Sequence, residues 1–316
     1  MVELSVVIPI YNEALNLERL HAEFTAALEG WGRPYELILV NDGSTDGSTG
    51  ALERIAAADG RVRVIEFRRN FGQTAAFAAG FAHARGRFIA TADGDLQNDP
   101  ADLPAMVAEA EAGCDIVCGW RKSRKDTFIN RRLPSIIANW LISRATGVKL
   151  NDYGCSLKVF RAEVVKPLRL YGEMHRFLPA LASEMGVRIV ERPVNHRARI
   201  HGKSKYGISR TVRVILDLMT VKFLLSYSTR PLQIFGLLGL VLGGLGGIVL
   251  AVLGYLRLIE AVSLDRHQPL LLFSVLMGFA GLQLLTIGLL AEMQVRTYHE
   301  SQGKPIYAIR RVIERP

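Results

Sequence analysis

Two long stretches without any charged side chain lie near the C-terminal end of the chain, at residues 231–256 and 269–291. Each is long enough to cross the roughly 30 Å hydrocarbon core of a bilayer as one helix. A buried core helix is the alternative for an apolar run, but the length of both runs and their Leu and Gly content favour the membrane. The sequence therefore predicts a two-helix transmembrane hairpin over residues 231–292.

Basic residues on both sides of this hairpin predict its orientation. They are Arg210, Arg213, Lys222 and Arg230 before it, and Arg296, Lys304, Arg310, Arg311 and Arg315 after it. The connecting residues around Asp265 carry no such excess. By the positive-inside rule, both ends of the hairpin face the cytoplasm. We expect a multi-pass protein of the inner (cytoplasmic) membrane whose residues 293–316 form a cytoplasmic tail.

The start of the chain and its cysteines fit that compartment. Leu4–Ile10 is an apolar run of strand length that leads into polar residues, so we expect no signal peptide. Cys114, Cys118 and Cys155 lack paired metal-ligand spacing and are expected to be free thiols in a reducing compartment.

The net charge of +9 is concentrated between residues 188 and 230. Nucleic acid is one possible partner for such a stretch. The stretch runs directly into the first apolar run, so an anionic lipid surface is favoured and no nucleic-acid partner is expected. Apolar residues share one helical face here, at Ile208, Val212, Ile215, Leu216, Met219 and Phe223. This pattern predicts an amphipathic helix on the membrane within residues 207–230, with a helix packed on the soluble domain as the alternative.

Gly239, Gly243 and Gly247 form a ridge at four-residue spacing in the first apolar run. Small residues let membrane helices approach closely. The ridge predicts close packing within the hairpin or between subunits of a homo-oligomer.

Strand-like and helix-like segments alternate over the first 120 or so residues. The expected strands are Leu4–Ile10, 37–41, Val62–Phe67, 88–92 and Ile116–Trp120. The expected helices are 15–28, Ser48–Ala58, 74–84 and 102–112. This order predicts an α/β fold with a mainly parallel sheet and helices on both faces. Such sheets bind ligands at the carboxyl ends of their strands.

Polar clusters follow the expected strands at 9–13, 41–46, 68–72 and 93–95. Tyr11 can stack on a base, and Glu13 and Asp42 can accept hydrogen bonds from a base or ribose. Ordinary turn structure is the alternative for each of them. Neither a Gly-x-Gly-x-x-Gly motif nor a P-loop occurs, which disfavours a dinucleotide or ATP site.

Asp93, Asp95 and Gln97 come directly after a buried strand. The period of two along an extended chain places both carboxylates on one face, and oxygen ligands suit Mg²⁺ or Mn²⁺. Such a cation could neutralise a leaving diphosphate. An acidic turn that caps the next helix is the alternative. The basic stretch 121–132 is predicted to be a lid that clamps phosphate, or else a solvated loop.

Three segments, 6–13, 40–47 and 93–97, resemble the GT-A glycosyltransferases of family 2 in order and spacing. Two more, 151–161 and 196–206, are similar to the polyprenyl-phosphate branch of that family, which includes dolichyl-phosphate mannose synthases, bactoprenol glucosyltransferases and undecaprenyl-phosphate aminoarabinose transferases. The resemblance implies a GT-A catalytic domain over residues 1–206. It implies inverting transfer of one sugar from a nucleotide-diphosphate sugar to polyprenyl phosphate, with Mg²⁺ or Mn²⁺.

The resemblance also implies residue roles. The nucleotide sugar would be bound by Pro9, Tyr11, Asn12, Glu13, Asp42, Asn70 and Asp93. The metal ligands would be Asp93, Asp95 and Gln97, and the catalytic residues Asp152, Asp95 and Arg121. The acceptor phosphate would be bound by Arg121, Arg132, Ser156, Arg197, Lys203 and Lys205.

The chemistry of the acceptor limits what Asp152 must do. A phosphate monoester has its second pKa near 6, so it is largely a dianion at cytoplasmic pH and can attack without losing a proton. We therefore expect Asp152 to orient the acceptor or a cation.

The donor is expected to be a UDP-sugar rather than a GDP-sugar. The Asp-Tyr-Gly-Cys sequence at 152–155 looks more like the aminoarabinose transferases than the glucose transferases. Glucose, N-acetylglucosamine and uronic acids stay open.

Two other functions are alternatives to this one. A processive family 2 polysaccharide synthase is disfavoured because no Gln-x-x-Arg-Trp segment occurs and two spans are few to line a polymer channel. A catalytically silent membrane scaffold that binds sugar nucleotides is disfavoured by the intact Asp93, Asp95 and Asp152.

Overall fold

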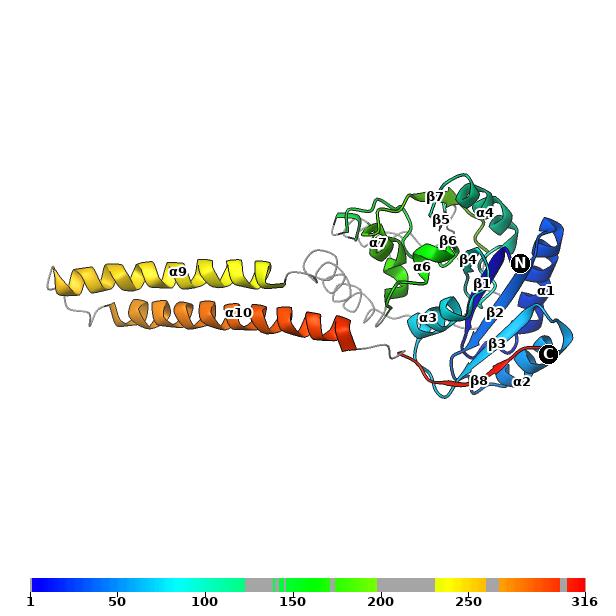
Figure 1. The fold of residues 1–316 in the computed structure, drawn as a ribbon, viewed down its shortest axis with the longest axis horizontal. Helices are drawn as coiled ribbons and strands as arrows, with labels where there is room; N and C mark the ends of the chain where they lie inside the picture. The colour runs from blue at the N-terminus through cyan, green and yellow to red at the C-terminus, as the bar shows by residue number, and fades with distance from the viewer. Residues whose placement is uncertain are drawn as a thin grey trace. The chain divides into compact units, whose positions relative to one another are not determined.

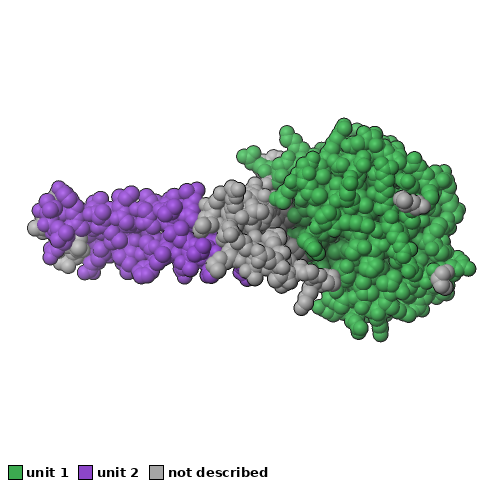
Figure 2. Space-filling view, in the orientation of Figure 1, with its two compact units in different colours: residues 1–221, 305–316 green, residues 222–304 purple. Residues whose placement is uncertain are grey.

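The structure is a computed structural model that describes residues 2–122, 139, 142–144, 146–170, 174–197, 231–259, 267–301 and 306–315. The chain forms two compact units (Figure 2). The first contains the predicted catalytic domain and is therefore called the catalytic unit below; it comprises residues 1–221 and 305–316, and the second unit comprises residues 222–304. The chain therefore leaves the catalytic unit once and returns to it at its C-terminal end.

One mixed sheet organises the catalytic unit (Figure 1). Its described strands are β1 (Leu4–Ile10), β2 (Tyr35–Asn41), β3 (Val62–Phe67), β4 (Phe88–Thr91), β5 (Ile116–Trp120), β6 (Lys158–Arg161), β7 (Ile189–Pro193) and β8 (Ile309–Ile313). Their spatial order is β7-β5-β6-β4-β1-β2-β3-β8. The central strands β4, β1, β2 and β3 run parallel, whereas β6 is antiparallel to β4 and β5, and β8 is antiparallel to β3. The five expected strands and the mainly parallel sheet are confirmed.

The helices of this unit are α1 (Leu17–Trp31), α2 (Ser48–Ala58), α3 (Gln73–His83), α4 (Leu103–Glu111), α6 (Ala162–Val165) and α7 (Leu178–Ser183), with short 3-10 turns at Pro100–Asp102 and Met174–Phe177. All four expected helices are present. The end of α1 lies beyond its predicted end because the chain stays helical up to Gly32. There a φ of 73° gives the left-handed conformation in which helices commonly terminate.

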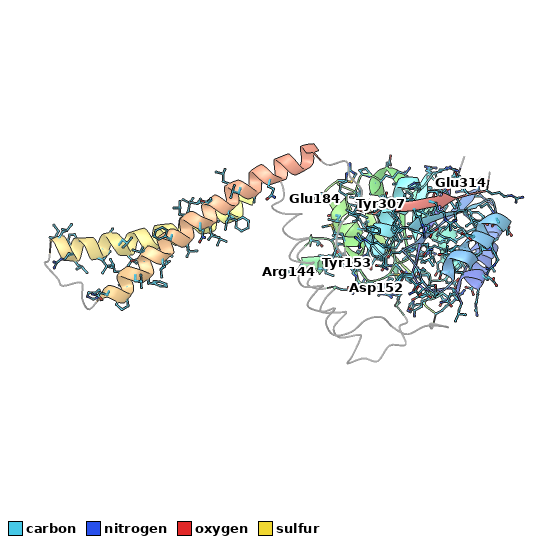
Figure 3. All side chains as sticks on the ribbon, turned by 90° about the horizontal axis from the view of Figure 1, so that it is seen from below. Arg144, Asp152, Tyr153, Glu184, Tyr307 and Glu314 are labelled. Atoms are coloured by element: carbon cyan, nitrogen blue, oxygen red, sulfur yellow. The ribbon has the colours of Figure 1, made fainter. Side chains whose placement is uncertain are left out.

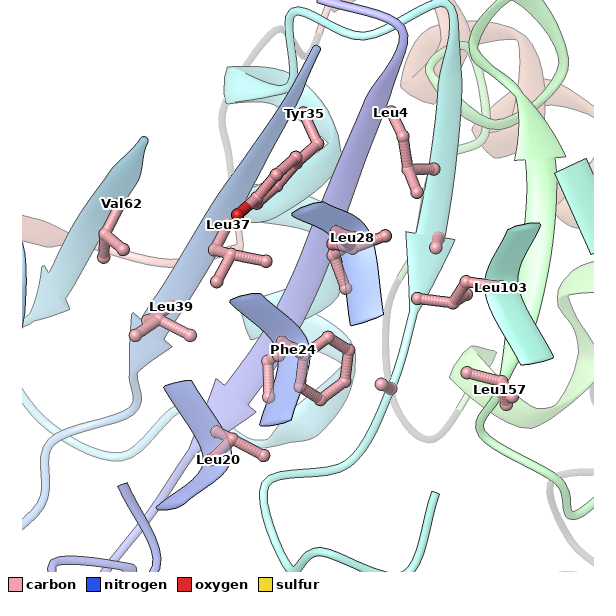
Figure 4. Close-up of a cluster of buried hydrophobic side chains, with 14 of the residues drawn as sticks. Leu4, Leu20, Phe24, Leu28, Tyr35, Leu37, Leu39, Val62, Leu103 and Leu157 are labelled. Atoms are coloured by element: carbon pink, nitrogen blue, oxygen red, sulfur yellow. The ribbon is translucent and has the colours of Figure 1, made fainter. Parts of the chain in front are cut away.

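Helices cover both faces of the sheet because side chains along a strand alternate in direction. On one face Leu4 belongs to the cluster that includes Phe24 of α1 and Leu37 of β2 (Figure 4). On the other face α3 lies directly on β1, since a Cβ added at Gly80 would stand 2.1 Å from Val7 Cγ1. Each fully buried Leu or Phe contributes roughly 1.5–3 kcal/mol to stability. This packing fixes the strand ends that carry the site.

Three strands were not predicted from the sequence. β6 and β7 are short, and β8 contains two consecutive arginines, Arg310 and Arg311, within the segment expected to be a tail. At this sheet edge both arginines form ion pairs with Glu66 of β3. Their charge suits an edge strand, and only the fold shows where their partner lies.

The second unit contains α9 (Pro231–Leu258) and α10 (Gln268–Ser301). Phe235–Leu258 and Gln268–Ala291 are long and apolar enough to cross a membrane. α10 is one helix up to Ser301, so it continues beyond the predicted end of the hairpin at residue 292. The predicted amphipathic helix at 207–230 and lid residues 123–132 lie outside the described residues.

Glycines bring α9 and α10 together. A Cβ added at Gly239 would lie 2.6 Å from Gly281 O, and one added at Gly246 would lie 2.6 Å from Ser274 O. The predicted ridge is correct at Gly239 but wrong at Gly247 for packing within the hairpin, since a Cβ there would meet nothing within 4 Å. A helix has 3.6 residues per turn, so a strict four-residue spacing drifts off the contact face and Gly246 takes the place of Gly247.

Candidate active site

The loop that follows β4, residues 92–97, holds the predicted metal ligands and is called the metal loop below. Asp93 Oδ1 accepts a hydrogen bond from Gln73 Nε2 at 2.8 Å, and Asp95 Oδ1 accepts one from the Gln97 backbone N–H at 3.2 Å. Leu96, which lies between Asp95 and Gln97 in the sequence, is buried and has φ 62°, in the left-handed region. Contacts on both sides thus hold this loop in a defined conformation at the carboxyl end of β4.

The predicted ligands in this loop are all oxygen atoms, from the carboxylates of Asp93 and Asp95 and the side-chain amide of Gln97. Among the described residues, no group of three or more His, Cys, Asp or Glu side chains could hold a metal ion. Mg²⁺ commonly takes only one or two protein carboxylates and completes its shell with water and substrate phosphate. The residues present therefore fit a hard divalent cation shared with a diphosphate.

Asn98 connects the metal loop to the predicted acceptor side. Its Oδ1 accepts a hydrogen bond from the Asp93 backbone N–H at 2.8 Å and another from Ser156 Oγ at 2.9 Å. Asn98 is 5% exposed. It was missed in the sequence because Asn after an acidic cluster is typical of a turn, and its link to Ser156 spans two distant segments. Asn98 thus places Ser156 beside the metal loop.

Asp152 and Arg121 form a bidentate ion pair near the end of β5. Arg121 Nε donates to Asp152 Oδ2 at 2.7 Å, and Arg121 Nη2 donates to Asp152 Oδ1 at 2.9 Å. The side chain of Asp152 is 3% exposed and that of Arg121 is 18% exposed. Burial opposes the charge on Arg121, but the hydrogen bonds and charge of Asp152 outweigh it and raise the pKa of Arg121. The negative charge of Asp93 acts on Arg121 in the same direction, so the pair belongs electrostatically to the metal loop.

Asp152 and Tyr153 (Figure 3) belong to a segment that two strands support through hydrogen bonds. Glu191 of β7 accepts a hydrogen bond from the Asp152 backbone N–H at 3.0 Å. The buried Lys158 of β6 donates hydrogen bonds to the backbone carbonyl oxygens of Tyr153 and Cys155. Two strands therefore fix the position of Asp152.

Asp42, at the end of β2, holds the neighbouring loop. Its two carboxylate oxygens accept hydrogen bonds from the backbone N–H groups of Phe71 at 2.7 Å and Gly72 at 3.0 Å. Burial raises the pKa of Asp42, and these two hydrogen bonds oppose the rise. Gly43 has φ 69°, and a Cβ there would stand 2.6 Å from Asn70 N, so only glycine fits. Asp42 and Asn70, both predicted to bind the nucleotide sugar, therefore lie close together.

The other predicted donor residues lie at the end of β1. Pro9 is in the strand and pairs with Val40, and its carbonyl oxygen would be 3.2 Å from a Cβ on Gly94 of the metal loop. Asn12 has φ 55°, and its Oδ1 accepts a hydrogen bond from the Thr45 backbone N–H. Glu13 Oε2 accepts from Asn16, and Tyr11 is 38% exposed. The ends of β1, β2 and β4 are thus adjacent in one site.

Comparison with known proteins decides the family. Residues 5–169 match the family model "Glycosyl transferase family 2". The chain belongs to glycosyl transferase family 2. This glycosyltransferase is 48% identical over 316 residues to a dodecaprenyl-phosphate galacturonate synthase of Rhizobium johnstonii, covering 99% of this chain and 93% of that protein. It is 37% identical over 310 residues to an undecaprenyl-phosphate 4-deoxy-4-formamido-L-arabinose transferase of Aeromonas hydrophila, covering 98% and 93%.

Solved structures confirm the GT-A fold of this glycosyltransferase. Glucosyl-3-phosphoglycerate synthase from Mycobacterium tuberculosis, in complex with Mn²⁺, UDP and glucosyl-3-phosphoglycerate, superimposes with a TM-score of 0.54 at 17% identity. The match covers 70% of this chain and 79% of that one. Mannosyl-3-phosphoglycerate synthase from Rubrobacter xylanophilus gives a TM-score of 0.55 at 15% identity, over 70% and 74%.

Of the remaining predicted acceptor residues of the glycosyltransferase, the structure describes Arg197. Arg197 lies between two carboxylates, with Nη1 2.6 Å from Glu23 Oε2 and Nη2 2.7 Å from Asp99 Oδ1. Its backbone N–H donates to Gln97 O at 2.9 Å. The structure thus shows Arg197 as a support of the metal loop, and its side chain is already engaged by two anions. Arg132, Lys203 and Lys205 lie outside the described residues.

Proposed function

We propose that this family 2 glycosyltransferase transfers one sugar from a UDP-sugar to a polyprenyl phosphate at the cytoplasmic leaflet, with inversion at the anomeric carbon. One observation carries the proposal. The similarity to proteins named for dodecaprenyl and undecaprenyl phosphate extends over nearly the whole chain, so it includes the apolar hairpin as well as the sheet. A hairpin that crosses the membrane would keep the catalytic unit beside a lipid acceptor.

The donor would bind across the ends of β1, β2 and β4. Tyr11 would stack on the base. Each carboxylate oxygen of Asp42 accepts one hydrogen bond from Phe71 or Gly72 and would retain a lone pair for a hydrogen bond from the base or the ribose. Asp93, Asp95 and Gln97 would hold Mg²⁺ or Mn²⁺. When bound, the cation would supply positive charge to the diphosphate that leaves.

The acceptor would approach from the side of Ser156 and Arg121. An oxygen of the ionised phosphate attacks the anomeric carbon, the bond from that carbon to the diphosphate breaks, and its electron pair leaves with UDP. The acceptor needs no deprotonation at neutral pH. We assign to Asp152 the task of holding the Arg121 guanidinium in place, because both carboxylate oxygens bind it and Asp152 is buried. Arg121 would then bind the acceptor phosphate.

We propose a uronic acid as the transferred sugar. The relative named for galacturonate is 48% identical to this chain, whereas relatives named for 4-deoxy-4-formamido-arabinose are 37–39% identical. The Asp-Tyr-Gly-Cys sequence favours the second group, so a direct comparison of the two donors is needed.

The test uses the full chain purified in detergent with undecaprenyl phosphate and Mn²⁺. Radiolabelled UDP-galacturonic acid and UDP-4-deoxy-4-formamido-arabinose are supplied in parallel, and label in the organic phase is counted. We expect transfer from the uronic acid, loss of transfer with EDTA, and an activity about 100-fold lower in Asp95→Asn. Asp115→Asn, on a carboxylate that pairs with Arg161 outside the site, is the matched control. Label that stays in water with every donor would refute the lipid acceptor.

A further inference from the structure

The C-terminal residues of the chain contact the loop that Asp42 holds. β8 pairs with β3 so that Ile309 lies opposite Phe67, the last residue of β3. One residue further on, the Arg68 backbone N–H donates to Ala308 O at 3.1 Å. The segment that follows α10 in the sequence therefore forms one side of the loop at residues 68–72, which we call the donor loop.

A chain of aromatic contacts continues from this segment to Asp42. The ring of Tyr307 (Figure 3) stacks on Phe67, with centroids 5.3 Å apart and an interplanar angle of 12°. Phe67 packs edge-on against Phe71, at 5.7 Å and 88°. The backbone N–H of Phe71 donates to Asp42 Oδ1. Three successive contacts thus connect Tyr307 to the carboxylate proposed to bind the donor.

Ion pairs keep β8 in this position. Arg311 binds Glu66 of β3 at 2.5 Å and also binds Glu53 of α2. Directly after the last residue of the strand, Glu314 binds Arg63 at 2.8 Å. Glu66 and Arg63 are buried, so these pairs are less screened than surface pairs. These pairs hold the middle and the end of the strand, and the Arg68 to Ala308 hydrogen bond holds its start beside Tyr307. Tyr307 is therefore a fixed platform for Phe67.

We propose that Tyr307 is a positioning residue for the donor nucleotide. It acts through Phe67 and Phe71 and keeps the donor loop in the conformation that Asp42 requires. The inference rests on the proposed function, in which Asp42 binds base or ribose. The further claim is that the affinity for the donor nucleotide depends on Tyr307. This residue follows the hairpin in the sequence and lies outside the motifs of the predicted catalytic domain.

Isothermal titration of UDP with Mn²⁺ into the full chain in detergent tests this proposal. An aromatic pair contributes about 0.5–1.5 kcal/mol beyond its area, so Tyr307→Leu should raise the Kd for UDP about two- to tenfold. The KM for the UDP-sugar should rise in parallel, with kcat and the acceptor KM unchanged. Tyr307→Phe keeps the ring and should bind UDP like the wild type. Val312→Thr, an exposed position on the same strand, is the control.

A double-mutant cycle separates this role from a general loss of stability. If Tyr307 acts through the donor loop, Tyr307→Leu should weaken UDP binding less in an Asp42→Asn background than in the wild type. Equal UDP affinity in Tyr307→Leu and the wild type, or additive effects in the cycle, would overturn the inference. If instead the proposed UDP-sugar donor is wrong, the titrations give a different result, because the wild-type protein would then bind GDP and not UDP. In that case GDP replaces UDP in the same titrations and the inference is still decided.

Discussion

Left-handed backbone occurs at two non-glycine residues among those described, and both lie at the proposed site. Asn12 has φ 55° and Leu96 has φ 62°. Asn tolerates this conformation, but for Leu it costs roughly 1–2 kcal/mol. The cost at Leu96 is offset by burial of its side chain, which is 2% exposed. The conformation turns the chain between Asp95 and Gln97, so we interpret it as strain retained for the metal loop.

This strain predicts an inverted order of two substitutions. Leu96→Ala and Leu96→Gly both remove the buried side chain, but only glycine relieves the left-handed φ. We expect Leu96→Gly to be more stable than Leu96→Ala by roughly 1 kcal/mol in thermal unfolding of the full chain. Leu20, buried in the interior of α1, is the control, where Gly should be worse than Ala by roughly 1 kcal/mol. The same order at both positions would contradict strain at Leu96.

The Asp152 and Arg121 pair predicts a loss that does not vary with pH. Asp152→Asn would leave Arg121, which is only 18% exposed, without its counter-ion and should lower stability by about 3 kcal/mol. It should also lower kcat by the same factor at pH 6.5 and pH 8.5, because Asp152 positions a cation and does not remove a proton. A loss that shrinks as pH rises would instead indicate a base.

Asp59 predicts how stability depends on pH. Burial alone would raise its pKa, but hydrogen bonds from Arg61 and His21 outweigh burial and hold the pKa of Asp59 well below its usual range. The stabilisation is therefore present above the unfolded pKa of about 3.9 and is lost as the pH falls below it. Asp59→Asn should lower stability by about 2 kcal/mol at pH 7 and progressively less below pH 4.

The control for Asp59 is Glu18→Gln. Glu18 pairs with Arg54 at 3.4 Å, and both side chains are exposed. Surface pairs of this kind contribute little, so thermal unfolding of Glu18→Gln should match the wild type at every pH. A constant difference between Asp59→Asn and the wild type from pH 3 to pH 7 would contradict the assigned cause.

At the scale of elements, close backbone contact defines the apolar hairpin. Helices in lipid gain little from apolar burial, so they depend on packing and close approach. A Cβ added at Gly281 of α10 would stand 2.6 Å from both Gly239 O and Gly243 N of α9. On the same helix α9, Gly244 and Gly247 have open space. One face of α9 therefore packs on α10, and a neighbouring face does not.

These contacts predict opposite outcomes for two glycine substitutions. Gly281→Ala should force α9 and α10 apart and lower the thermal midpoint of the hairpin, measured by circular dichroism in detergent. Gly247→Ala meets no atom and improves helix propensity, so its midpoint should equal or exceed that of the wild type. A lower midpoint for Gly247→Ala and not for Gly281→Ala would show that the two helices pack on other faces.

At the scale of the whole molecule, the chain leaves the catalytic unit before α9 and returns to it in β8. A strand cannot pair with β3 from the opposite side of a bilayer. If α9 and α10 cross the membrane, the start of α9 and the end of α10 must therefore face the same compartment as the sheet. This conclusion does not depend on the count of basic residues that predicted the orientation.

Cysteine labelling in intact cells tests this topology. A membrane-impermeant maleimide added from outside should label Asp265→Cys between the two helices. It should label Arg315→Cys, just after β8, only after the membrane is opened. The native Cys114, Cys118 and Cys155 are buried, which keeps the background low. Labelling of Arg315→Cys in intact cells would exclude the proposed cytoplasmic catalytic unit.

The sequence by itself determined what consecutive residues encode. The apolar run of β1, the helical period in α2 and the charge-free runs of the hairpin are local patterns, and the structure has all three. The order of Asp93, Asp95 and Gln97 after a buried strand likewise predicts a metal site at the end of β4, which stays a prediction.

Only the tertiary structure decided which distant groups meet. Glu66 gives Arg311 a partner 245 residues away, Asn98 connects Asp93 to Ser156, and Arg197 lies between Glu23 and Asp99. No local pattern specifies such pairs, because a charged side chain looks the same in the sequence whether it faces solvent or a buried carboxylate. Burial and strand order make the choice, since the cost of removing a charge from water is offset only where the fold brings a partner into contact.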